Sequence, residues 1–113
     1  MGIGTKQRDL CKALTVIETA AVSLGYDLVR EDARRDTRVH GEFGEKKSYA
    51  SAHSVHKLKL AQDYSLFKSG GYITGQEADL VFGKLHDIGD VLGLAKRING
   101  DLGHFSKEHN GYR

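Results

Sequence analysis

The apolar positions near the start of the chain predict one long amphipathic helix. Over residues 9–24, apolar side chains recur every three or four positions, as they do along the buried face of a helix. Gly25 follows, where a helix C-terminus favours glycine. Residues 26–29 read as a short strand. The stretch 30–49 is charged and punctuated by glycine, and we expect it to be an exposed loop.

Alternation replaces helical spacing in the middle of the chain. Over residues 57–66, apolar and polar side chains alternate with one interruption at Gln62, which predicts a strand with one buried and one polar face. Residues 69–71 (Ser-Gly-Gly) form a turn signal, and residues 72–73 are expected to return as a second strand. Cross-strand pairing in such a hairpin is antiparallel.

A second helix and a polar tail complete the pattern. Thr74 and Glu77 have the spacing of a capping box, and apolar residues continue at helical spacing over 78–88. Residues 99–113 are polar, with scattered aromatic residues, and predict turns. The order of elements indicates an α+β fold: a small single domain with a short antiparallel sheet and helices packed on it.

The composition of the chain excludes several classes of protein. At 113 residues the chain has the size of one domain, and its single cysteine, Cys11, excludes an internal disulfide and a cysteine-based zinc finger. The longest apolar run falls short of the ~20 residues that a membrane span needs, and the first residues lack the apolar core of a signal peptide. A net charge of +2 is too small for a dedicated nucleic-acid binder. We therefore expect neither a membrane nor a nucleic acid as partner.

Six histidines are the unusual feature, and two segments combine them with carboxylates. Residues 51–63 offer His53, His56 and Asp63, and residues 101–109 offer Asp101 and His104. Imidazole and carboxylate are the ligands of zinc sites without cysteine. A straight strand would hold His56 and Asp63 ~23 Å apart, so the chain must bend if both bind one metal. Asp101 and His104 can face one point in a turn. Spacing alone does not separate ligands from surface or core histidines.

The two segments resemble a known enzyme family. Residues 54–63 read S-V-H-K-L-K-L-A-Q-D, residues 64–72 read Y-S-L-F-K-S-G-G-Y, and residues 100–106 read G-D-L-G-H-F-S. In this order they are similar to the zinc motifs of the peptidoglycan-cleaving D-alanyl-D-alanine carboxypeptidase and L-alanyl-D-glutamate endopeptidase family, most of all to its small phage endolysin branch. The resemblance runs from about Tyr26 to the C-terminus.

The resemblance implies a catalytic zinc ion. It makes His56, Asp63 and His104 the ligands, at the edge of the sheet, and Asp101 the catalytic acid/base. It implies one zinc peptidase domain over 1–113, with the N-terminal helix in 1–25 and the catalytic core in 26–113. The implied chemistry is metal-assisted amide hydrolysis.

The resemblance also implies roles for an arginine and a serine. E-D-A-R-R-D-T aligns Arg35, or the adjacent Arg34, with an arginine that polarises the scissile carbonyl, and Ser54 matches a substrate-contacting hydroxyl residue. His53 lies ten residues from Asp63 where the family has seven, so we interpret it as a neighbour. We expect His40, His86 and His109 on the surface and Cys11 to be a reduced packing residue. The family's usual tryptophans before the final histidine are missing, which leaves substrate preference open.

The function implied is cleavage of the peptidoglycan stem peptide by a monomeric phage lysis enzyme, at the L-alanyl-D-glutamate bond. Without a signal peptide, such an enzyme would accumulate in the host bacterial cytoplasm before lysis. The alternatives are a D-alanyl-D-alanine carboxypeptidase and a non-catalytic zinc or cell-wall-binding module. A metal-dependent nuclease rests only on basic charge and histidines.

Overall fold

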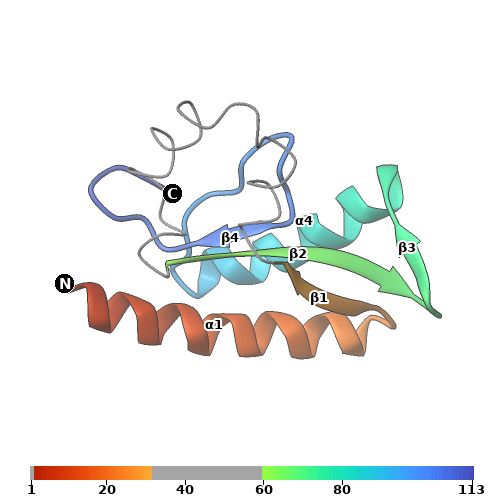
Figure 1. Ribbon diagram of the computed structural model, residues 1–113, viewed down its shortest axis with the longest axis horizontal. Coiled ribbons are helices and arrows are strands. Elements are labelled where there is room, and N and C mark those ends of the chain that lie inside the picture. The colour runs from red at the N-terminus through yellow and green to blue at the C-terminus, as the bar shows by residue number, and fades with distance from the viewer. Residues whose placement is uncertain (1, 32–59) are drawn as a thin grey trace, which may run out of the picture.

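Residues 2–31 and 60–113 are described in the computed structural model, and they form two helices and an antiparallel sheet (Figure 1). In chain order the elements are α1 (Ile3–Ser23), β1 (Asp27–Glu31), β2 (Ala61–Lys68), β3 (Gly71–Ile73), α4 (Gly75–Val91) and β4 (His104–Ser106). The predicted α+β class is confirmed.

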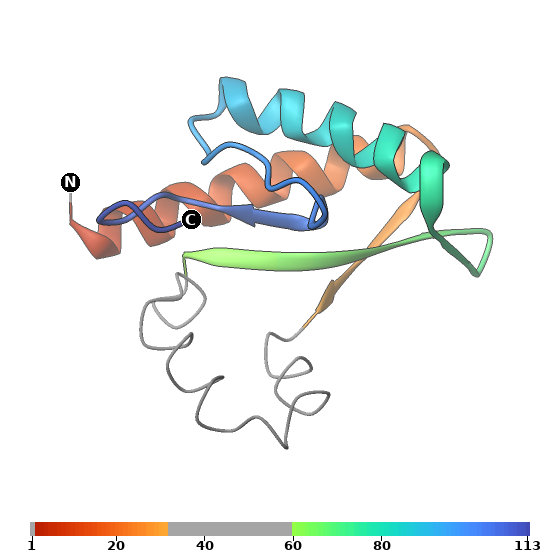
Figure 2. The ribbon, with the colours of Figure 1, turned by 90° about the horizontal axis from the view of Figure 1, so that it is seen from above.

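β2 is the central strand of the sheet. β1 pairs with it along one edge, from Asp27 opposite Phe67 to Glu31 opposite Asp63. The other edge is shared, because β4 pairs with residues 61–63 and β3 pairs with residues 66–68. Figure 2 shows α1 and α4 together on one side of β2. The sheet therefore has one face towards the helices and one face away from them.

The hydrophobic core fills the space between the helices and the inner face of the sheet. α1 contributes the stripe that its sequence predicts, and it ends in a Schellman motif: Gly25 has φ +91°, and the Tyr26 amide donates to the carbonyl of Ala21. The buried apolar side chains of this core are Leu10, Ala13, Leu14, Ile17 and Ala21 from α1, Ala78, Val81, Phe82 and Leu85 from α4, Leu94 from the loop after α4, and Tyr64, Leu66 and Phe105 from the sheet. The helix predicted over 9–24 is confirmed and begins six residues earlier, at Ile3.

Three local predictions need correction. The exposed loop expected from residue 30 begins later, because β1 continues to Glu31 in pairing with Asp63. The tail contains a strand as well as turns, since β4 pairs with β2. Thr74 is the N-cap residue of α4 as predicted, but its side chain makes no capping hydrogen bond among the described residues. The Glu77 carboxylate instead accepts a hydrogen bond from the hydroxyl of Tyr26, at 2.6 Å.

The predicted exposure of two side chains, His86 and Cys11, is wrong. His86 was expected on the surface, yet it is 2% exposed, because it follows Phe82 by four residues on the inward face of α4. Cys11 was expected to pack but is exposed, since Leu10 and Leu14 take the buried stripe of α1. His109 is partly buried and accepts a hydrogen bond from the Lys6 ammonium at 3.1 Å. His40 lies outside the described residues.

Candidate metal centre

Cross-strand pairing brings Asp63 and His104 together. Asp63 in β2 is directly opposite His104 in β4, and both side chains lie on the face of the sheet that points away from the helices. The distance from Asp63 Oδ1 to His104 Nδ1 is 2.9 Å. His104 is 6% exposed, and the side chain of Asp63 is 22% exposed. Two residues that lie 41 positions apart in the chain thus form one polar pair at the sheet edge.

Two successive turns place Asp101 beside this pair. The Asp101 amide donates to the carbonyl of Ile98 at 3.0 Å, and the His104 amide donates to the carbonyl of Asp101 at 3.2 Å. Gly100 has φ +85°, which the first turn requires and which favours glycine. One ligand atom each from Asp63, Asp101 and His104 lies within 4.8 Å of the others. The expectation that Asp101 and His104 face one point is confirmed, and the two form a group with Asp63.

Gly103 allows the second turn to lie directly against β2. Its carbonyl accepts a hydrogen bond from the Tyr64 amide at 2.9 Å. A Cβ atom at this position would lie 2.6 Å from the carbonyl oxygen of Tyr64, closer than real Cβ atoms approach backbone oxygens. Glycine at 103 is therefore a steric requirement for bringing His104 opposite Asp63. From sequence it was only one of several turn glycines, and nothing in its neighbours distinguishes it.

The donor set fits a metal ion. Imidazole nitrogen and carboxylate oxygen are ligands of zinc sites without cysteine, and one such atom from each of Asp63, Asp101 and His104 lies within 4.8 Å of the others. Asp63 and Asp101 also bring two carboxylates within 4.8 Å of each other, and a cation relieves the repulsion between like charges. Asp63, Asp101 and His104 can therefore hold a metal ion, with one nitrogen and two oxygen donors.

A pocket opens beside these three residues. It has a volume of about 300 Å³ and lies along the β2 edge between β4 and β3, where neither strand pairs with β2. Asp63 and Asp101 form part of its wall, together with Tyr72, Thr74 and Leu102. A molecule in the pocket would lie beside Asp63 and Asp101 of the candidate metal group.

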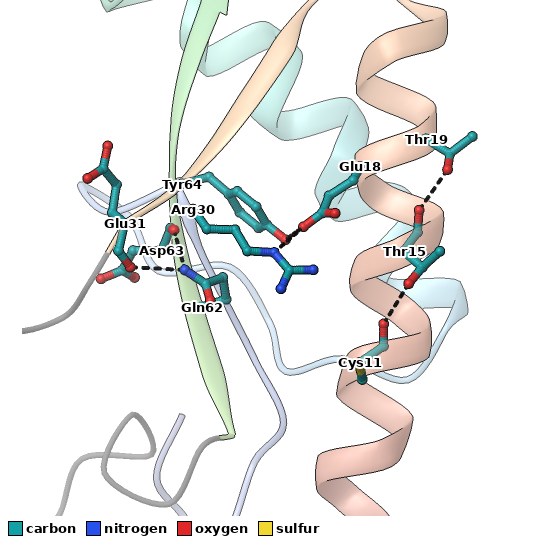
Figure 3. A network of polar contacts seen from close by, with 9 residues as sticks. All are labelled: Cys11, Thr15, Glu18, Thr19, Arg30, Glu31, Gln62, Asp63 and Tyr64. Atoms are coloured by element: carbon teal, nitrogen blue, oxygen red, sulfur yellow. Dashed lines mark hydrogen bonds and ion pairs between the residues drawn. The ribbon is translucent and has the colours of Figure 1, made fainter.

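β1 adds a third carboxylate to the same face, which the sequence analysis missed. Glu31 is directly opposite Asp63, and its carboxylate accepts a hydrogen bond from the hydroxyl of Ser65. Gln62 donates from Nε2 to the backbone carbonyls of Glu31 and Asp63, at 2.9 Å each (Figure 3). The missed signal is the alternation of side chains in β1, which continues two residues beyond the predicted strand.

The described residues contain half of the predicted site. They bring together Asp63, Asp101 and His104. The other three site residues, Arg35, Ser54 and His56, lie outside the described residues, as does the alternative arginine, Arg34. Asp101 was expected to be a proton carrier beside the metal, and its carboxylate also lies within reach as a ligand.

Comparison with known proteins adds no relative. No protein-family model matches the chain, and neither the curated proteins nor the solved structures contain a match. Within residues 2–31 and 60–113, neither helix combines the length and apolar character that crossing a membrane requires.

Proposed function

We propose that the protein is a zinc-dependent peptidase that hydrolyses an amide bond in the peptidoglycan stem peptide, most specifically the L-alanyl-D-glutamate bond, as a phage lysis enzyme. The observation that carries the proposal is the grouping of Asp63, Asp101 and His104 within 4.8 Å. These are the residues that the two family-like motifs assign to the zinc site. A chance resemblance in two separate segments gives no reason for their side chains to meet.

The proposed roles divide metal binding from proton transfer. His56, Asp63 and His104 hold the zinc ion, which when bound polarises the substrate carbonyl and lowers the pKa of a water molecule towards ~7. Asp101 accepts the proton of the attacking water and delivers it to the amide nitrogen as the C–N bond breaks. Its carboxylate is exposed, which suits exchange with water and substrate. Arg35 stabilises the charge that develops on the carbonyl oxygen, and Ser54 contacts the substrate.

The pocket supports a peptide substrate. A volume of about 300 Å³ at the low end of ligand-binding clefts accommodates a short piece of extended peptide beside Asp63 and Asp101. In this proposal the protein acts as a monomer on the cell wall, after accumulating in the cytoplasm of the host bacterium. A D-alanyl-D-alanine carboxypeptidase would use the same residues on the terminal bond of the stem peptide.

The position of Asp101 favours one second candidate, a non-catalytic zinc module that binds the cell wall. If Asp101 binds the metal together with His56, Asp63 and His104, four protein ligands close the coordination sphere. Structural zinc sites have four protein ligands, whereas catalytic sites keep one position open. The two candidates therefore differ in what Asp101 does.

Zinc content and digestion products test the proposal together. The purified protein is loaded with ZnCl₂, dialysed, and incubated with peptidoglycan of the diaminopimelate type and of the lysine type. We expect one zinc ion per chain and fragments with a new amino-terminal D-glutamate by mass spectrometry. Release of D-alanine alone would instead identify a carboxypeptidase. Binding of zinc and peptidoglycan without cleavage would leave the non-catalytic module.

Substitution of Asp101 tests whether this residue is the catalytic base or a zinc ligand. Asp101→Ala is expected to keep zinc and to lose cleavage. His104→Ala is expected to lower zinc affinity by more than the roughly 10–100-fold that removal of an outer-shell partner costs. Glu108→Ala, which removes an exposed carboxylate four residues beyond His104, is the matched control and should change neither. Loss of zinc in Asp101→Ala would favour the closed, non-catalytic site.

A further inference from the structure

His86 lies directly beneath the turn that carries the candidate metal group, although it takes no part in the proposed chemistry. It is on the inward face of α4 and is 2% exposed. Its Nε2 atom lies 2.8 Å from the carbonyl oxygen of Leu102, the residue that follows Asp101. Buried polar side chains normally have a hydrogen-bond partner, and the partner of His86 is the turn.

The same imidazole also contacts the strand on the far side of the turn. Its ring stacks on Phe105 with the centroids 3.9 Å apart and the planes inclined by 9°. Leu102 precedes Gly103 and His104 in the chain, and Phe105 follows them. His86 therefore holds the segment on both sides of His104, by a hydrogen bond before it and by a stacked ring after it.

The direction of the hydrogen bond follows from the chemistry of its two atoms. A carbonyl oxygen only accepts, so Nε2 of His86 carries the proton and donates. Burial lowers the pKa of His86, which favours the neutral ring with a single N–H. That single N–H donates to the carbonyl oxygen of Leu102.

We propose that His86 is a positioning residue that holds the turn from Asp101 to His104 in the geometry that binds the metal ion. The inference rests on the metal site of the proposed function, but not on the reaction or the substrate. Without His86, chain connectivity and the hydrogen bond with Tyr64 still restrain the turn, but the turn is no longer bonded to His86 of α4. The spacing of the Asp63 and His104 ligand atoms then becomes less well defined, and metal affinity falls.

Two variants separate the contacts of the imidazole. His86→Phe keeps an aromatic ring to stack on Phe105 and removes the donor to Leu102. His86→Gln keeps an N–H donor near the position of Nε2 and removes the ring. Zinc affinity is measured by competition with a chromophoric chelator, and the ligand geometry by the visible absorption of the Co²⁺-loaded protein.

We expect His86→Phe to weaken zinc binding about tenfold, the low end of the effect of outer-shell partners. It should also alter the Co²⁺ absorption bands, whereas His86→Gln should recover most of the affinity and the wild-type bands. The matched control is Arg97→Ala, because Arg97 also connects the preceding loop to α4, through the carboxylate of Asp87 at 2.7 Å and the carbonyl of Gly83 at 3.3 Å, and its hydrogen bonds within the described part of the chain go to α4. The control should bind zinc within about twofold of the wild type. A thermal shift on adding zinc, measured against each apo protein, removes any general loss of stability from the comparison.

Each alternative outcome has one meaning. Wild-type zinc affinity and Co²⁺ bands in His86→Phe would overturn the inference, as would an equal loss in Arg97→Ala. If His86→Phe does not fold, His86→Leu, which removes both contacts with a smaller side chain, takes its place: wild-type zinc affinity and Co²⁺ bands in it overturn the inference, and weaker binding with altered bands supports it. A wild-type protein that binds no zinc or cobalt overturns the inference together with the metal site. Zinc binding that depends on His86, in a protein that cleaves no peptidoglycan, supports the inference and overturns the peptidase.

Discussion

The two faces of the β1–β2 pair use carboxylates in different ways. On the inner face, Glu18 of α1 accepts hydrogen bonds from the hydroxyl of Tyr64 at 2.5 Å and from Nε of Arg30 at 2.6 Å (Figure 3). On the outer face, Asp63 lies against His104, with a second carboxylate, Asp101, in the same group. Tyr64 and Asp63 are consecutive residues, so alternation along one strand separates the two arrangements.

The difference is one of charge balance. Burial tends to raise the pKa of Glu18, but its bonds to Arg30 and Tyr64 outweigh this and lower it, so the carboxylate is ionised beside a guanidinium. The group of Asp63, Asp101 and His104 places two acids around one imidazole, which attracts a further cation. The inner arrangement connects α1 to the sheet, and the outer one is suited to bind an ion. Carboxylates at neighbouring positions can thus serve structure and chemistry separately.

The largest expected effect comes from Gly103→Ala, because Gly103 contacts the backbone of Tyr64 and positions His104. The new Cβ would lie 2.6 Å from the Tyr64 carbonyl oxygen, so the turn must move away from β2. Overpacking of this kind costs about 1–3 kcal/mol, and we expect the free energy of unfolding in denaturant to fall by that amount. Zinc affinity, measured by chelator competition, should fall at least tenfold because His104 shifts relative to Asp63.

The control for this substitution is Gly83→Ala in α4. Among residues 2–31 and 60–113, its Cβ would meet only Arg97 Nη1, at 3.7 Å, and alanine in a helix interior is favoured over glycine by about 0.5–1 kcal/mol. We expect this variant to be slightly more stable and to bind zinc as the wild type does. Normal zinc affinity in Gly103→Ala would mean that the outer group does not depend on the close approach to β2.

Gly103 also marks the boundary of what the sequence could predict. Periodicity identified α1, β2 and α4, because each has a regular face that alternation or helical spacing reveals, and the Ser-Gly-Gly turn indicated β3. The motifs identified Asp63, Asp101 and His104, which the fold brings together. Local pattern could not reveal β4, whose three residues acquire a partner only through contact with β2. Such features depend on tertiary contacts and leave no periodic signal.

A smaller effect is expected from Tyr64→Phe, which tests whether the two faces are independent. The substitution removes the phenol that donates to Glu18 and keeps the ring packed edge-to-face on Phe105, with centroids 5.8 Å apart. We expect the free energy of unfolding to fall by about 1 kcal/mol, the usual net contribution of a hydrogen bond. Zinc affinity should not change, since the backbone of Tyr64 still holds Gly103.

Tyr26→Phe is the matched control for the phenol. It also removes a hydroxyl that donates to a carboxylate, that of Glu77, but at an exposed position. We expect a smaller loss there than in Tyr64→Phe, because water replaces the bond. Weaker zinc binding in Tyr64→Phe, with Tyr26→Phe unaffected, would show that the inner network and the outer group are coupled.

The smallest expected effect is the pH dependence of Glu18→Gln, which isolates the charge of the inner network. The pKa of Glu18 is lowered below 4.5 in the folded state, so its ionised form contributes stability above that pH, and the contribution is lost as the pH falls through the folded pKa. At pH 7 the variant should be less stable by about 0.2–1 kcal/mol, the range of partly exposed ion pairs such as that with Arg30. Thermal melts from pH 7 to pH 3 should show the two proteins converging below pH 4.5. Glu77→Gln is the control for general acid effects, because it removes a carboxylate that accepts a hydrogen bond but lies outside this network. A difference in stability between wild type and Glu18→Gln that stays constant from pH 7 to pH 3 would contradict the role of charge.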